Sequence, residues 1–170
     1  MSECVKVLRD ELPYNLHIFV NSVEFIAKVI DTLKLAPEAV KIVCSTSGDS
    51  RQENQRKLGN AYPIGQPSDP AKKINFYTST CFEGCDIFDP DGVTFIVSDG
   101  RKAHTLLDIS TLFTQICGRI RDSRYKTQIV HVYSTTKYSK AVTLDEFVAA
   151  TQRTLADAEK FASDINAVDE

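Results

Sequence analysis

Residues 16–22, Leu-His-Ile-Phe-Val-Asn-Ser, open the pattern that decides the fold. The apolar run over 16–20 has the length and composition of a buried strand. Ser22 can cap a helix over 22–35, because apolar side chains recur there with helical period. Those apolar positions are Val23, Ile26, Ile30 and Leu33. A strand that leads straight into an amphipathic helix predicts one unit of an α/β fold.

The alternation of strand and helix patterns continues along the chain. Further strands are predicted over 40–44, 74–78, 93–97 and 128–133, and further helices over 2–12, 50–58, 105–120 and 143–165. Asp108 stands at the N-cap position of the helix that is expected to end near Ile120. Short apolar strands that alternate with amphipathic helices predict an α/β fold with a mostly parallel sheet flanked by helices. Loops at the carboxyl ends of such strands are where ligands bind.

Length and composition fit an ordinary domain and set limits on its function. The 170 residues are enough for one domain with a single core. The apolar runs are far shorter than a membrane span and no signal peptide opens the chain, so a cytoplasmic protein with no membrane contact is predicted. A net charge of −3 counts against an autonomous nucleic-acid binder. The five cysteines are odd in number and irregularly spaced, which indicates neither a disulfide framework nor a metal site.

The first stretch with chemistry is the junction of strand and helix at Ser22. Unbonded amides and a hydroxyl at a helix N-terminus make a site for phosphate. Ser45 and Thr46 leave the second predicted strand in a similar way and also suit a phosphate. In both places a simple helix cap is the alternative role of the hydroxyl side chains.

The second stretch is residues 78–87, Thr-Ser-Thr-Cys-Phe-Glu-Gly-Cys-Asp-Ile. Thr78 ends the predicted strand, and a glycine and an aspartate follow six and eight residues later, at Gly84 and Asp86. Gly84 would let a ligand approach the backbone closely. The alternative is an ordinary turn between strand and helix, in which Asp86 acts as a cap.

The third stretch is residues 115–124, Gln-Ile-Cys-Gly-Arg-Ile-Arg-Asp-Ser-Arg, at the end of the helix that Asp108 caps. A buried helix needs neither a glycine nor an arginine in its last turn, whereas a phosphate site uses guanidinium groups. Arg119 and Arg121 are the arginines closest to the expected helix end. The alternative is a surface cluster of arginines that stabilises the negative end of the helix dipole.

Together and in this order, the three stretches resemble motifs IV, V and VI of superfamily 2 (DEAD/DEAH-like) helicases. The glutamine-x-x-glycine-arginine signature of motif VI matches Gln115, Gly118 and Arg119, and the resemblance covers most of the chain. The glycine-arginine-x-arginine form is similar to that of helicases akin to viral origin-binding proteins. The resemblance implies a RecA-like three-layer fold. Residues 1–140 would form the C-terminal RecA-like lobe, and residues 141–170 a helix of that lobe or the start of an accessory region.

The resemblance also implies a role for each matched position. The side chains expected at the nucleic-acid backbone are Ser22, Ser45, Thr46, Thr78 and Ser79. The residues expected at the nucleotide are Gly84, Asp86, Gln115 and Arg119. Catalysis is expected from Arg119 as an arginine finger, with Gln115 and Arg121 beside it.

Two positions depart from the family pattern. Glu83 stands where motif V usually has an arginine, and Asp122 stands where motif VI has its second arginine. A carboxylate that faced the γ-phosphate of a nucleotide would repel it. Arg121 or Arg124 is therefore expected to supply the missing positive charge.

The sequence lacks the phosphate loop of a complete motor. No Gly-x-x-x-x-Gly-Lys-Ser/Thr stretch occurs, and no predicted strand ends in an aspartate-glutamate pair that could hold Mg²⁺. The expected function is the second motor lobe of an ATP-dependent nucleic-acid helicase, which binds a single strand and completes an ATP site. The Mg²⁺ of that site would be held by an absent first RecA-like lobe, and the isolated lobe would hydrolyse little ATP. The alternative is a non-catalytic RecA-like interaction module that docks on a partner protein, which the acidic net charge and Asp122 favour.

Overall fold

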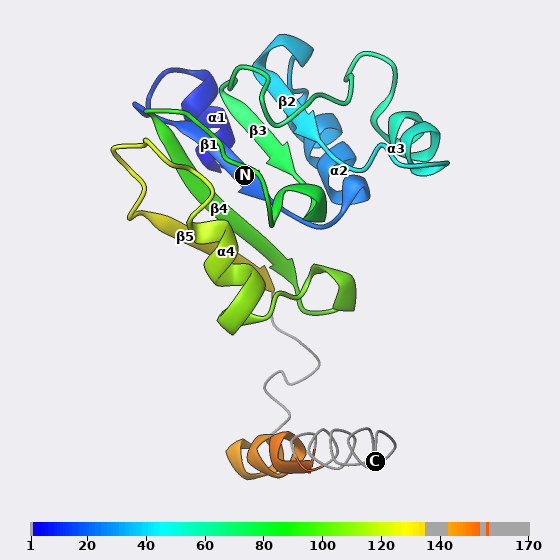
Figure 1. Cartoon of the computed structure of the whole chain (residues 1–170), viewed down its shortest axis with the longest axis vertical. Helices are drawn as coiled ribbons and strands as arrows, with labels where there is room; N and C mark the ends of the chain where they lie inside the picture. The colour runs from blue at the N-terminus through cyan, green and yellow to red at the C-terminus, as the bar shows by residue number, and fades with distance from the viewer. Residues whose placement is uncertain (1, 135–142, 154–155, 157–170) are drawn as a thin grey trace, which may run out of the picture. The chain divides into compact units, whose positions relative to one another are not determined.

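The computed structural model describes residues 2–134, 143–153 and 156 (Figure 1). The chain divides into two compact units, Met1–Ser134 and Thr135–Glu170, and each is described by itself. The first unit contains a sheet with helices on both faces.

The sheet of the first unit has five strands in the order β2-β3-β1-β4-β5. The strands are β1 (Asn15–Phe19), β2 (Val40–Val43), β3 (Ile74–Tyr77), β4 (Gly92–Asp99) and β5 (Ile129–Ser134). Every pair of neighbours is parallel, and Ile18 of β1 lies opposite Phe76 on one side and Phe95 on the other. All the strands predicted from the sequence are present, with bounds that differ by at most two residues.

Helices and ordered loops cover both faces of the sheet (Figure 1). The α-helices are α1 (Ser2–Leu8), α2 (Val23–Leu33), α3 (Ser50–Leu58) and α4 (Thr114–Cys117). Apolar side chains of α1, α2 and α3 join one hydrophobic cluster, whereas those of α4 and of the segment between β3 and β4 join another. The result is three layers around a parallel sheet, which is the RecA-like α/β arrangement predicted from the sequence.

β1 contributes side chains to both clusters. Leu16 and Ile18 pack in the cluster with α1 and α2, while Phe19 packs in the cluster with α4. Successive side chains of a strand point to opposite faces, and a parallel sheet is covered on both. Burial on both faces explains why the run over 16–20 is almost entirely apolar.

The helix predicted over 105–120 is shorter and less regular than expected. It consists of the π-helix η4 (Ile109–Phe113) followed by one α-helical turn, α4. Asp108 caps this helix, since its Oδ1 accepts the backbone amide of Thr111 at 2.9 Å. The predicted N-cap is therefore correct, whereas the predicted range 105–120 starts four residues too early and ends three residues too late.

The early end of this helix has a backbone cause. Gly118 follows α4 with φ −93° and ψ 2°, outside the helical pattern. Ile120 then forms a parallel bridge with Ile87, which takes the backbone of this segment out of the helix. Arg119 and Arg121 therefore lie on either side of the bridge residue Ile120 and not on the last helical turn.

The connections that leave β1 and β4 run over opposite faces of the sheet. The connection from β1 passes through α2 to β2, and the connection from β4 passes through α4 to β5. α2 and α4 belong to different hydrophobic clusters. The two connections therefore diverge to opposite faces of the sheet, between the carboxyl ends of β1 and β4. Open α/β sheets bind ligands at such a switch point.

In the second unit, residues 144–153 and 156 are helical, and the rest of the helix predicted over 143–165 lies outside the described residues. Thr143 and Glu146 form a capping box at its start. Oε2 of Glu146 accepts the Thr143 amide at 2.8 Å, and Oγ1 of Thr143 accepts the Glu146 amide at 3.3 Å. Within the described parts of the chain, no helix is long and apolar enough to cross a membrane.

Candidate functional site

Five of the predicted site residues lie in three loops at one edge of the sheet. Ser22 follows β1, Ser45 and Thr46 follow β2, and Thr78 and Ser79 follow β3. Because β2, β3 and β1 are parallel neighbours, these loops lie side by side at the carboxyl ends of the strands. We name these five residues the carboxyl-edge row.

Ser22 caps the helix that follows it. The residue is buried, its amide donates to the Val20 carbonyl at 2.8 Å, and its Oγ accepts the Phe25 amide at 3.2 Å. Ser22 therefore caps the helix, and the cap uses the same hydroxyl that is expected to contact a phosphate. The amides suited to an anion are those in the first turn of α2, since the first turn of a helix has no intrahelical acceptor.

Asn21 has no role in the sequence prediction, yet it connects three loops. Its Nδ2 donates to the His104 carbonyl at 2.8 Å, and its Oδ1 accepts the Ser79 amide at 3.4 Å. The loop after β1 therefore touches the loops after β3 and β4. An asparagine directly after a buried strand is the sequence signal, but its partners lie far along the chain.

The loop after β2 exposes hydroxyl groups. Oγ of Ser45 lies 2.9 Å from Oγ of Ser47, and the Asn54 side chain donates to the Ser45 carbonyl at 3.0 Å. These contacts stabilise the turn into α3. Thr46, between the two serines, is exposed to solvent.

Thr78 contributes its backbone to the sheet. Its amide donates to the Val43 carbonyl at 3.0 Å, and its hydroxyl lies 3.4 Å from that of Thr80. A phosphate contact by this buried residue would therefore use the hydroxyl and not the amide. Ser79 is exposed and begins the 3₁₀ turn η2 (Ser79–Cys81).

Backbone pairing joins the loop after β3 to the segment after α4. The Ile87 amide donates to the Arg119 carbonyl at 2.9 Å, and the Arg121 amide donates to the Ile87 carbonyl at 3.0 Å. The pairing places Asp86 beside Arg121, whose Nε donates to Oδ1 of Asp86 at 2.7 Å. We name Gly84, Asp86, Gln115, Arg119 and Arg121 the arginine site. It lies on the face of the sheet covered by α4.

The guanidinium of Arg119 is held from two sides. Nε donates to the Gln115 carbonyl at 2.9 Å and Nη2 donates to Oε1 of Gln115 at 3.1 Å. Nη1 donates to the Cys85 carbonyl at 3.1 Å, and the residue is only 8% exposed. All three acceptors are neutral, so these contacts leave the positive charge uncancelled. A guanidinium has five N–H donors, and one on each terminal nitrogen lies outside these bonds.

The two arginines expected to replace the second arginine of motif VI both form ion pairs. Arg121 pairs with Asp86, and Nε of Arg124 donates to Oδ1 of Asp91 at 2.7 Å. The side chains of the first pair are 47% and 50% exposed, and those of the second are 65% and 40% exposed. Exposed ion pairs are weak, so an anionic ligand can compete for either arginine.

Gly84 is required by the conformation of the backbone. Its φ is +70°, a left-handed value that side chains with a Cβ rarely adopt. A Cβ added there would meet no atom within 4 Å, so the space beside it is open. The turn accounts for the glycine that the sequence pattern assigned to the nucleotide.

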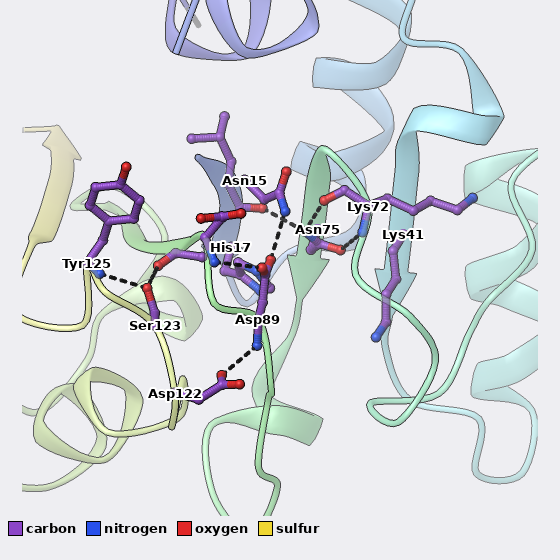
Figure 2. Close-up of polar contacts among 12 residues, drawn as sticks. Asn15, His17, Lys41, Lys72, Asn75, Asp89, Asp122, Ser123 and Tyr125 are labelled. Carbon is purple, nitrogen blue, oxygen red and sulfur yellow. Dashed lines mark hydrogen bonds and ion pairs between the residues drawn. The ribbon is translucent and has the colours of Figure 1, made fainter. Parts of the chain in front are cut away.

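Figure 2 shows a buried polar network around His17, whose partners come from segments distant in sequence. Nε2 of His17 lies 2.8 Å from Oδ2 of Asp89, and Nδ1 lies 3.1 Å from the Tyr77 hydroxyl. The Asn15 side chain donates to the same carboxylate oxygen at 3.0 Å. Oδ1 of Asp122 accepts the Asp89 amide at 2.8 Å, so Asp122 stabilises the turn before β4.

Burial and hydrogen bonding shift two pKa values in the amino-terminal half of the sheet. Burial raises the pKa of the Asp89 carboxyl, but hydrogen bonds from His17, from Asn15 and from a backbone amide outweigh it and leave the pKa below its usual range. Burial lowers the pKa of the Lys41 ammonium, which donates to the Pro67 carbonyl at 2.9 Å. Both groups serve the fold, because they bind loops that precede strands.

Metal binding has no support in the part of the chain that the structure describes. No group of three or more histidine, cysteine, aspartate or glutamate side chains there could hold a metal ion.

Comparison with known proteins adds no family. The chain matches no protein-family model, no curated protein and no solved structure. A function for the carboxyl-edge row and the arginine site therefore depends on their own chemistry.

Proposed function

We propose that residues 1–140 form the second motor lobe of an ATP-dependent nucleic-acid helicase or translocase. One observation carries the proposal: the loop that starts at Thr78 in the carboxyl-edge row continues to Asp86 and Ile87, where backbone bonds join it to Arg119. A single loop thus links the expected strand contacts to the expected nucleotide contacts. Such a link is what a motor needs to couple hydrolysis to movement.

The carboxyl-edge row would bind the backbone of a single strand. Thr46 and Ser79 offer exposed hydroxyl groups on neighbouring strands, and α2 offers the amides of its first turn. Neighbouring strands of a sheet lie about 4.8 Å apart, so the loops that carry these donors lie side by side. Hydroxyl and amide donors suit phosphate and sugar oxygens and read no base identity.

The arginine site would bind the phosphates of ATP together with the first RecA-like lobe, which would hold the Mg²⁺. Gln115 and Cys85 fix the guanidinium of Arg119, so little ordering remains to be done when a phosphate arrives. An arginine finger of this kind is worth on the order of 10³–10⁵ in rate. Asp86 would bind the ribose of ATP in place of Arg121. Arg121 would then be able to bind the phosphates.

The proposed motor therefore has two partners, a single-stranded nucleic acid and a first RecA-like lobe. Its cofactor is ATP, and it would act in the cytoplasm. The isolated chain would bind strands weakly and hydrolyse little ATP, because its net charge is −3 and half of the ATP site is supplied by the partner.

Fluorescence anisotropy with a labelled single-stranded oligonucleotide tests the first half of the proposal. At low salt the full chain should bind, and the Thr46→Glu/Ser79→Glu variant should lose most of that binding because it places carboxylates at the expected phosphates. Ser68→Glu adds one such charge at an exposed serine in the loop before β3 that does not belong to the carboxyl-edge row, and it should bind like wild type. Absence of wild-type binding at high micromolar protein would contradict the proposal.

An ATPase assay tests the second half. Fusion of a first RecA-like lobe with an intact phosphate loop should restore strand-stimulated ATPase activity, and Arg119→Ala should abolish it. Arg9→Ala removes an exposed arginine between α1 and β1, whose partner is Glu11, and it should retain activity. Full activity in Arg119→Ala would refute the arginine-finger role.

A second candidate function has an observation in its favour. Arg119 is almost fully buried and Arg121 is paired with Asp86, an arrangement that also suits a structural role. The chain would then be a RecA-like interaction module that docks on a partner protein. The same anisotropy titration separates the two, since a module of this kind shows no salt-dependent binding to a single strand.

A further inference from the structure

A groove of about 590 Å³ opens between α2 and the loop that follows β4. Its walls carry charged side chains and its floor is partly apolar. The lining includes Glu24, Phe25, Lys28, Asp99, Arg101 and Lys102. The sequence pattern assigns no site to any of these residues, because isolated basic side chains are usually solvated surface.

The groove lies at the switch point of the sheet. α2 leaves β1 on one face and the chain after β4 leaves towards the other, so the carboxyl ends of these two strands flank it. A small neighbouring pocket is lined by both Ser22 and Lys102. The groove is thus continuous with the carboxyl-edge row, and open α/β sheets place ligands at this position.

Hydrogen bonds hold the loop after β4 in place. Oγ1 of Thr105 accepts the Asp99 amide at 2.9 Å and donates to the Lys102 carbonyl at 2.8 Å. The Asn21 side chain donates to the His104 carbonyl from the loop after β1. The backbone that carries Lys102 is therefore fixed relative to the first turn of α2.

Charges in the groove favour an anion. Three cationic side chains face two carboxylates, which leaves one positive charge in excess. Arg101 is bound to Asp99 by two hydrogen bonds, at 3.1 and 3.3 Å. Nζ of Lys102 lies 3.9 Å from Glu24, at the limit of an ion pair, and Lys28 has no ion pair among the described residues. Lys28, which is unpaired among these residues, and Lys102, whose ion pair with Glu24 is long, are therefore the cations most accessible to a ligand.

We infer that this groove binds the phosphate backbone of a single-stranded nucleic acid through Lys28 and Lys102. The inference rests on the proposed function and extends the carboxyl-edge row from three strands to four. The groove contributes two cations, Lys28 and Lys102, and each can neutralise one phosphate. The groove therefore adds one or two phosphate contacts to those of the row.

Anisotropy titrations over a range of salt concentrations test the inference with the full chain and a labelled single-stranded oligonucleotide. Lys28→Gln/Lys102→Gln removes both groove cations. Lys6→Gln/Lys73→Gln is the matched control, because it removes the same charge from exposed lysines on α1 and before β3, away from the groove. Thermal unfolding of each variant checks that the fold is intact.

The groove variant should bind several-fold more weakly at low salt than the control. The slope of log affinity against log salt should fall by roughly 0.7 for each phosphate that the variant no longer binds. Equal binding by the groove variant and the control would overturn the inference that the groove binds phosphates. The Thr46→Glu/Ser79→Glu variant would still test the carboxyl-edge row independently. Absence of binding by the wild type would remove the proposed function and the groove with it.

Discussion

His17 of β1 and Asp89 of the turn before β4 form a hydrogen-bonded pair in which the side chains are 0% and 6% exposed. An ionised carboxylate can only accept, so Nε2 of His17 carries the proton in this 2.8 Å contact. In the neutral ring Nδ1 then accepts from the Tyr77 hydroxyl. The pair links the turn that precedes β4 to β1, the central strand of the sheet.

Asp89→Asn should destabilise the fold by about 1.5–3 kcal/mol at neutral pH, because a buried charged hydrogen bond is removed. The pKa of Asp89 is lowered in the folded state, so its stabilising effect is present above the unfolded value near 3.9 and is lost as pH falls through the folded pKa. Urea unfolding of wild type and variant should therefore converge below about pH 4.

Asp91→Asn is the matched control for that measurement. Asp91 lies two residues along the same turn, but its side chain is 40% exposed and pairs with Arg124. Its removal should cost less than about 1 kcal/mol, as is usual for exposed ion pairs. Equal destabilisation in Asp89→Asn and Asp91→Asn would show that burial of the His17 pair contributes nothing.

Gly92→Ala should disturb the same pair from the other side. A Cβ at this position would lie 2.9 Å from Cδ2 and Nε2 of His17 and 3.2 Å from Cδ1 of Ile120. The His17 ring is fully buried, so it can move little, and overpacking should cost about 1–3 kcal/mol in urea unfolding. The variant should also lose part of the acid dependence that Asp89 contributes.

Substitutions at Gly84 can be compared with those at Gly92, because at Gly84 no atom would clash with an added Cβ. The φ of +70° at Gly84 strains any Cβ, so Gly84→Ala should cost about 1–2 kcal/mol. Gly84→Asn should cost less, since asparagine tolerates the left-handed region. At Gly92, where the obstacle is the His17 ring, asparagine should be no better than alanine. Equal stability of Gly84→Ala and Gly84→Asn would contradict the role of φ.

The α/β fold is predictable from local pattern alone. The strands β1 to β4 are short, mostly apolar runs because both of their faces are covered, whereas β5 is largely exposed. The order β2-β3-β1-β4-β5 is not predictable in this way, since it depends on which strands pair across the chain. The end of α4 is missed for the same reason, because the bridge between Ile87 and Ile120 is a long-range contact.

The candidate site residues also divide into those that local sequence pattern predicts and those that depend on long-range contacts. Ser22, Thr46 and Thr78 are predictable as residues at strand ends because each lies within two residues of an apolar run. The partners of Asp89 and Asn21 are not, because they come from segments distant in sequence. Whether the predicted residues bind phosphate stays a prediction for the titrations proposed above.

Cysteine reactivity should follow burial. Burial raises the pKa of the Cys44 thiol to about 11 and also raises that of Cys81, so neither is a thiolate near pH 8. Cys85 is partly exposed. Alkylation with iodoacetamide at pH 8 should modify Cys85 first, and Cys44 and Cys81 only after unfolding in urea. Peptide mass spectrometry measures the order, and early modification of Cys81 would contradict the packing around it.

Arg119→Lys tests whether the guanidinium fork stabilises the arginine site. A lysine has its donors on one atom and cannot reach Gln115 and the Cys85 carbonyl together, so urea unfolding should show a destabilisation of about 1–3 kcal/mol. Arg121→Lys keeps the charge beside Asp86 on an exposed surface and should change stability by less than about 0.5 kcal/mol. Strand binding should be unchanged in both, because neither arginine belongs to the carboxyl-edge row. If Arg119→Lys is as stable as wild type, the guanidinium fork does not contribute to holding the loop after β3 against the segment after α4.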